Sequence, residues 1–75
     1  MAFTIEADPV PLTATDNGVV RVTGTRVTLD SLVYAFEEGA TAEEIALRYP
    51  TLRLVDIYSV IAYFLNHQDE VKVYL

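Results

Sequence analysis

The 75-residue chain lacks cysteine altogether and contains a single histidine. Without cysteine there is no disulfide and no cysteine-ligated zinc, and one histidine is too few to build another zinc site. The longest near-continuous apolar stretch, residues 54–65, is about a dozen residues long, whereas a membrane-spanning helix needs roughly twenty. The first residues show no basic segment leading into a secretory hydrophobic core. We therefore expect no metal, cofactor or membrane contact, and the lack of cysteine fits a cytoplasmic protein.

Basic residues are also scarce: five Lys and Arg stand against eleven Asp and Glu, which gives a net charge of −6. This balance gives poor long-range attraction to nucleic acid, so we expect DNA binding to be weak for the protein alone and to depend on a local basic patch. Apolar residues make up 52% of the chain, too many for a disordered segment. Residues 1–75 form one small domain, and domains of this size often need self-association for stability, so we expect a homodimer.

The first part of the chain, residues 1–27, predicts a β-hairpin. Strand-forming residues occupy 10–14 and 19–22. Asn17 and Gly18 lie between them, and Asn-Gly is the pair that supplies two positive-φ residues to a two-residue hairpin turn.

The remainder, residues 28–75, has helical spacing. Gly39 is expected to end a first helix, as a C-terminal glycine does. Thr41 and Glu44 match a capping box, which begins a second helix directly afterwards. A third helix is predicted from about Leu54 to Asn66.

Residues 70–75 are assigned to a last short helical turn, with a strand as the alternative. The sequence thus predicts an α+β fold, in which an N-terminal β-hairpin precedes a three- to four-helix, helix-turn-helix-like bundle. The predicted core consists of Val20, Val22, Val27, Leu29, Leu32, Val33, Phe36, Ile45, Tyr49, Leu52, Leu54, Ile57, Ile61 and Phe64.

Residues 41–65 have the layout of a helix-turn-helix: a short capped helix, a tight turn and a longer helix. A DNA reader carries Arg, Lys, Asn, Gln or Ser at the exposed start of its second helix. Here that helix offers only Arg53 and Ser59, and Asp56 between them would repel phosphate. We therefore interpret the third helix as core and subunit contact rather than as a base-reading helix.

The densest positive segment of the chain lies just before the first helix, between residues 21 and 26. One interpretation is a phosphate-contacting loop. The alternative is that Arg26 pairs with Asp30 or with a partner carboxylate and that Arg21 is a solvated strand residue. The candidate nucleic-acid contacts are Arg21, Thr23, Thr25, Arg26 and Arg53.

Apolar side chains cover more of the third helix than one core contact requires. Tyrosine adds to this surplus, because it combines apolar area with one polar tip and suits protein interfaces. The candidate dimer-interface residues are Tyr34, Tyr58, Ile61, Ala62, Tyr63 and Leu65. No nucleophile, phosphate-loop or metal motif accompanies them, so we expect no catalytic residues and no enzyme.

Several short motifs follow one another over roughly residues 11–75: a glycine hairpin, then G-T-R-V, L-D, G-A-T-x-E-E-I, Y-P-x-L and D-I-Y-x-x-I-A-Y. Their order and spacing resemble the "domain of unknown function 433" family of small prokaryotic proteins. The resemblance implies a homeodomain-like helical core behind a β-hairpin. It also implies a symmetric dimer and a role as an antitoxin or regulator.

Many members of that family resemble VapB-type antitoxins, which are paired with PIN-like ribonuclease toxins. The resemblance therefore implies a dimeric antitoxin-like module that restrains such a toxin. The tail contains no arginine to plug a carboxylate-lined nuclease site, so we expect apolar packing by Val71, Val73, Tyr74 and Leu75 instead. The alternatives are a helix-turn-helix DNA-binding regulator, possibly acting on its own operon, and a purely structural dimer.

Overall fold

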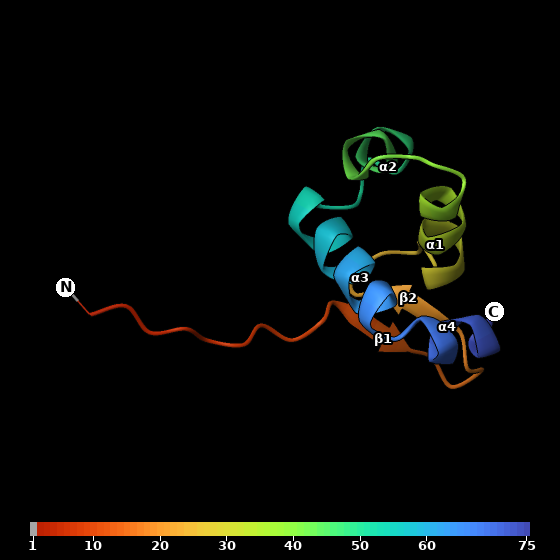
Figure 1. Ribbon diagram of the computed structural model, residues 1–75. Coiled ribbons are helices and arrows are strands. Elements are labelled where there is room, and N and C mark those ends of the chain that lie inside the picture. Colours follow the sequence, from red (N-terminus) through yellow and green to blue (C-terminus); the bar gives the residue numbers. More distant parts are fainter. Residues whose placement is uncertain (1) are drawn as a thin grey trace.

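The computed structural model describes residues 2–75, and Met1 lies outside the described residues. A two-stranded antiparallel sheet is followed by four helices, which confirms the predicted α+β fold. The elements are β1 (Leu12–Ala14), β2 (Val20–Val22), α1 (Leu29–Glu37), α2 (Ala42–Arg48), α3 (Leu54–Asn66) and α4 (Gln68–Tyr74). In Figure 1 the hairpin and α4 lie at one end of the helical body, α2 lies at the opposite end, and α3 runs between them.

The hairpin turn differs from the two-residue turn that Asn17-Gly18 predicts. The amide of Gly18 donates to the carbonyl of Thr15 over 2.9 Å, and the amide of Thr15 donates to the carbonyl of Val19 over 2.7 Å. Only Gly18 of the turn has positive φ, at 80°. The connection is thus a three-residue loop that closes on a left-handed glycine. The hydroxyl of Thr15 also accepts from the amide of Val19 over 3.2 Å, which stabilises this longer turn.

Side-chain caps begin the first two helices. The hydroxyl of Thr28 accepts from the amide of Ser31 and begins α1. At α2 the hydroxyl of Thr41 accepts from the amide of Glu44, while the Thr41 amide donates to the Glu44 carboxylate, over 3.1 and 3.0 Å. The capping box is therefore confirmed. Helix α3 begins at Leu54, and its N-cap residue Arg53 makes no side-chain cap hydrogen bond.

The core lies between the helices and one face of the hairpin. Most of the predicted core residues are buried or pack against the buried core. The rings of Phe36 and Phe64 meet edge to face, with 6.2 Å between their centroids. Leu54 is the exception, because its side chain is 41% exposed. Sequence reasoning also missed Val60 and Val71, which are buried. The inner face of α3 is thus rotated relative to the predicted Leu54-centred stripe.

Candidate protein-interaction surface

The most distinctive surface of the molecule is an exposed apolar strip along α3. Ile57, Val60 and Phe64 point into the core. Successive residues of a helix are rotated by about 100° around its axis. Beside the inward-pointing residues lies a sector of the helix surface, about 100° wide, that holds only exposed apolar side chains. We call this sector the α3 outer face, and it consists of Leu54, Val55, Tyr58, Ala62 and Leu65.

The exposure of this face is substantial. The side chains of Val55, Tyr58 and Leu65 are 56%, 50% and 51% exposed. The spacing of Val55, Tyr58, Ala62 and Leu65 is three, four and three residues, which is the repeat by which one helix packs along another. Ala62 lies at the middle of this row, where a small side chain lets a second helix approach closely. The α3 outer face is therefore suited to receive a helix.

A hydrogen bond between α2 and α3 fixes the orientation of the tyrosine in this face. The hydroxyl of Tyr58 donates to Oε2 of Glu43 over 2.5 Å. This bond is the main reason that the pKa of Glu43 lies below its ordinary value, and it raises the pKa of Tyr58 because it favours the protonated phenol. Both groups are exposed, so the bond positions the Tyr58 ring more than it stabilises the fold.

The structure separates the predicted interface residues into three groups. Tyr58, Ala62 and Leu65 lie together on the α3 outer face. Ile61 and Tyr63 are half-buried and pack against the core instead, and Tyr63 also stacks on the His67 ring at 4.2 Å.

Tyr34, the remaining predicted interface residue, is 50% exposed on α1. Sequence reasoning did not select Val55 for the interface, because it falls outside the stripe that includes Leu54 and Leu65. It also missed Leu47, which is 82% exposed and belongs to α2 rather than to α3. A helical wheel drawn around the true inner face would have found Val55.

The candidate nucleic-acid residues do not form one patch with Arg53. Arg21 lies on β2, by the C-terminal end of α3, whereas Arg53 stands at the N-terminal end of that helix (Figure 1). The 13 residues of α3 correspond to about 20 Å of helix. The hydroxyl of Thr23 bonds to that of Thr13, and the hydroxyl of Thr25 donates to the carbonyl of Val22, so both threonines serve the loop itself.

The predicted alternative of an Arg26–Asp30 ion pair is not present. Within residues 2–75, the charge pair that lies within salt-bridge distance joins His67 to Glu70, at 3.5 Å. Oδ1 of Asp30 is buried, and it has no hydrogen-bond partner among residues 2–75. Arg21 and Arg26 are exposed, and among residues 2–75 no carboxylate lies within salt-bridge distance of either guanidinium group.

The C-terminal tail is used largely by the fold itself. Val71 is 4% exposed and belongs to the core, and Leu75 packs against that core. The hydroxyl of Tyr74 accepts from the amide of Val20 over 2.8 Å and ties α4 to β2. Val73 is 88% exposed and Tyr74 is 37% exposed. Apolar packing of the whole tail on a partner would therefore require α4 to leave the domain.

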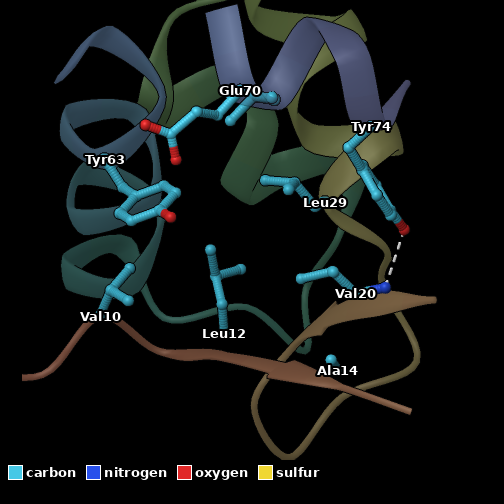
Figure 2. A pocket seen from close by; sticks show the side chains of 9 residues that line it. Val10, Leu12, Ala14, Val20, Leu29, Tyr63, Glu70 and Tyr74 are labelled. Atoms are coloured by element: carbon cyan, nitrogen blue, oxygen red, sulfur yellow. Dashed lines mark hydrogen bonds between the residues drawn. The ribbon is translucent and has the colours of Figure 1, made fainter. Parts of the chain in front are cut away.

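A second apolar feature lies between the hairpin and α4. An open pocket of about 330 Å³ is bounded by the hairpin on one side and by α3 and α4 on the other. Figure 2 shows Tyr63 and Glu70 facing the hairpin side chains across this space, while Tyr74 closes one side through its bond to Val20. We call it the hairpin pocket, and its lining residues are Val10, Leu12, Ala14, Val20, Leu29, Tyr63, Glu70, Val71 and Tyr74.

The residues 2–75 hold no group of three or more His, Cys, Asp or Glu side chains arranged to bind a metal ion. In the same residues, no helix combines the length and the apolar character needed to cross a bilayer.

The fold and surface define a small hairpin-and-helix domain with an exposed apolar helix face. A family model described as "Protein of unknown function (DUF433)" matches residues 14–64. This match covers more than half of the chain, so the protein belongs to the DUF433 family. Neither a search of curated proteins nor a search of solved structures returned a match.

Proposed function

We propose that this protein is a non-enzymatic, homodimeric protein-binding module of antitoxin type, which acts in the cytoplasm and restrains a partner protein such as a PIN-like ribonuclease. The observation that carries the proposal is the α3 outer face. In a helix-turn-helix protein the exposed start of the second helix reads bases with polar side chains. The exposed apolar residues in the first turns of α3 are Leu54, Val55 and Tyr58, which favour contact with protein rather than with DNA.

A second copy of the chain is the first partner of this face. A two-fold axis beside α3 places the same apolar row against itself, as an isologous dimer requires. The row has the spacing of a helix–helix seam, and Asp56 points to the other side of the helix. Pairing two copies removes exposed Val55, Tyr58 and Leu65 from water, which a 75-residue domain otherwise leaves uncovered.

Dimerisation is tested by sedimentation of variants that place a charge on one of two surfaces. Ala62→Glu introduces a carboxylate into the middle of the α3 outer face at little cost in helix propensity. Val73→Glu introduces the same charge at an 88% exposed position of α4, away from the α3 outer face, and serves as the matched control. We expect Ala62→Glu to shift the protein to monomer and Val73→Glu to leave the dimer unchanged.

The antitoxin role is tested by co-expression with a PIN-like ribonuclease encoded next to this protein. The proposal predicts that the two proteins co-purify and that the complex cleaves RNA more slowly than the free nuclease. If the purified nuclease neither binds this protein nor loses activity in its presence, the antitoxin role is refuted, whatever the oligomeric state.

A DNA-binding regulator is the second candidate, and the free guanidinium groups of Arg21 and Arg26 favour it. A symmetric dimer would present this pair twice. DNA binding through them predicts that Arg21→Ala or Arg26→Ala reduces the dependence of log affinity on log salt by about one unit per lost phosphate contact. The net charge of −6 works against tight binding. No retardation of DNA at low salt would exclude this role for the protein alone.

A further inference from the structure

The N-terminal segment, residues 2–9, extends away from the domain as an arm (Figure 1). Every one of these residues is exposed, and none takes part in a hydrogen bond within residues 2–75. Phe3 and Ile5 are 87% and 86% exposed. Two large apolar side chains held in water are costly, so a surface that covers them would stabilise the protein.

The arm has the sequence pattern of a β-strand with one apolar face. Phe3, Ile5 and Ala7 alternate with Thr4 and Glu6, and side chains at alternate positions of a strand lie on the same side. An extended arm thus presents its apolar residues together on one side. Such a segment can add to the free edge of a sheet.

Strand β1 offers a free edge. Its neighbours Pro11 and Thr15 bond β2, through the pairs Thr23 amide to Pro11 carbonyl and Thr15 amide to Val19 carbonyl. Because bonded positions alternate in an antiparallel pair, Leu12 and Ala14 direct their backbone groups to the opposite edge. The amide of Leu12 donates to the carbonyl of Val10 over 2.9 Å, whereas no hydrogen bond within the described residues uses the carbonyl of Leu12 or the amide of Ala14. The part of the edge from the Leu12 carbonyl to Ala14 can therefore accept another strand.

The hairpin pocket lies along the same edge and on the apolar face of the hairpin. Leu12 and Ala14 line it (Figure 2). A space of about 150 Å³ is enough for one benzene ring, so a pocket of about 330 Å³ has room for the ring of Phe3 and for the branched side chain of Ile5. A strand added to β1 with its apolar side toward the pocket would fill it.

The arm cannot return to its own β1 through a tight turn at Pro9 and Val10. With Pro9 at the second position of the turn, Val10 takes the third position. A type I turn is disfavoured there because Val10 precedes Pro11, and a type II turn requires positive φ from a β-branched residue.

Fully extended, the eight residues of the arm reach about 26 Å. That reach matches the shorter dimensions of the molecule, 27 and 24 Å, and is sufficient to meet a neighbouring copy.

We propose that the arm of one copy adds to the β1 edge of a second copy as a third strand, with Phe3 and Ile5 in the hairpin pocket of that copy. In a two-fold dimer the exchange is reciprocal. The outer side of the added strand then carries Glu6 on the same sheet face as Thr13 and Arg21, so the charges are complementary. The arm adds buried residues to the α3 contact and brings the interface closer to the about 20–30 residues per partner of standard complexes.

This inference shares the homodimer with the proposed function but rests on a different surface. The α3 outer face is tested by Ala62→Glu, and the arm is tested by engineered disulfides. The two can fail separately, because a dimer without an arm crosslink would refute only the arm exchange.

The experiment uses the absence of native cysteine. A chain with Glu6→Cys is mixed with a C-terminally tagged chain with Thr13→Cys, two positions on the same face of the proposed strand pair. On mild oxidation we expect a disulfide between the two chains in at least tenfold higher yield than between Glu6→Cys and Thr51→Cys, an exposed residue of the α2–α3 connection. Equal yields would overturn the proposal.

The apolar anchors are tested in the same assay. Adding Phe3→Ala and Ile5→Ala to the Glu6→Cys chain should reduce the crosslink at least tenfold, whereas Thr4→Ala, on the other side of the strand, should leave it unchanged. These arm residues make no contact that holds the domain, so the variants keep the fold. The Glu6→Cys/Thr13→Cys double variant tests whether the arm binds its own chain. At high dilution, an intramolecular disulfide that forms in preference to the disulfide between chains would overturn the exchange.

Discussion

The clearest stability prediction contrasts two valines of the same short helix. Val71 is 4% exposed and Val73 is 88% exposed, and both lie in α4. Val71→Ala removes two buried carbon atoms, each worth about 0.8 kcal/mol of transfer free energy. Because the packed surroundings relax only partially, a cavity cost adds to this loss. We expect the free energy of unfolding to fall by about 2–3 kcal/mol, a large share of the roughly 4–11 kcal/mol typical of a domain of this length.

Val73→Ala is the matched control. It makes the same change in side chain and helix propensity at an exposed position, so we expect an effect within about 0.5 kcal/mol. Urea unfolding followed by far-UV circular dichroism gives both values. One protein concentration must be used throughout, because the stability of a dimer depends on concentration. Equal midpoints for the two variants would refute the burial of Val71 and restore the tail as a free partner-binding element.

Three further predictions concern the caps and the Tyr58–Glu43 hydrogen bond. Thr41→Ala breaks the capping box and should lower the free energy of unfolding by about 1 kcal/mol in the same urea assay. Arg53→Asp supplies the missing cap of α3 and should raise it by about 0.5–1 kcal/mol; a loss would mean that the arginine makes a contact of its own. Tyr58→Phe should return the pKa of Glu43 toward its ordinary value of 4.5 in an NMR titration. The lowered pKa of Glu44 should not move, since it depends on Thr41.

The sign of the pH effect follows from the direction of the Glu43 shift. A carboxyl group whose pKa is lower in the folded state adds stability above its ordinary pKa, and that stability is lost as the pH falls through the lowered value. Tyr58→Phe should therefore reduce the loss of stability on the acid side. The pKa of Tyr58 is raised above its ordinary value of 10.0, so this group adds stability below pH 10.0. That stability is lost as the pH rises through the raised pKa.

Features that depend on neighbouring residues could be predicted from the sequence. The start of α2 follows from Thr41 and Glu44, whose mutual hydrogen bonds span three residues. The end of α1 follows from Gly39, which has a φ of 101°. The number and order of elements are also local properties, since each follows from spacing and turn chemistry along a short stretch.

The rotation of α3 could not be predicted, because apolar residues surround most of this helix. A stripe through Leu54 and Ile61 and a stripe through Val60 and Phe64 fit helical spacing equally well. Only the packing of α1 and α2 selects the second stripe, and this choice exposes Leu54 and Val55. The composition of the α3 outer face is therefore a tertiary result.

The role of the tail depends on contacts that are distant in the sequence. Tyr74 bonds to Val20 across 54 residues, and Val71 packs beneath the hairpin that forms one wall of the pocket. The sequence assigned residues 70–75 to a last helical turn, and the structure forms helix α4 over Gln68–Tyr74. Sequence reasoning could not show that the domain itself covers Val71, which is 4% exposed. The hairpin pocket arises from the same long-range arrangement.

Sedimentation equilibrium over micromolar concentrations tests the central claim, that the α3 outer face joins two copies of the chain. We expect a species of twice the 8.4 kDa chain mass for the native protein and for Val73→Glu, and a species of 8.4 kDa for Ala62→Glu. A native protein that sediments at 8.4 kDa throughout, or an Ala62→Glu variant that remains dimeric, would contradict it.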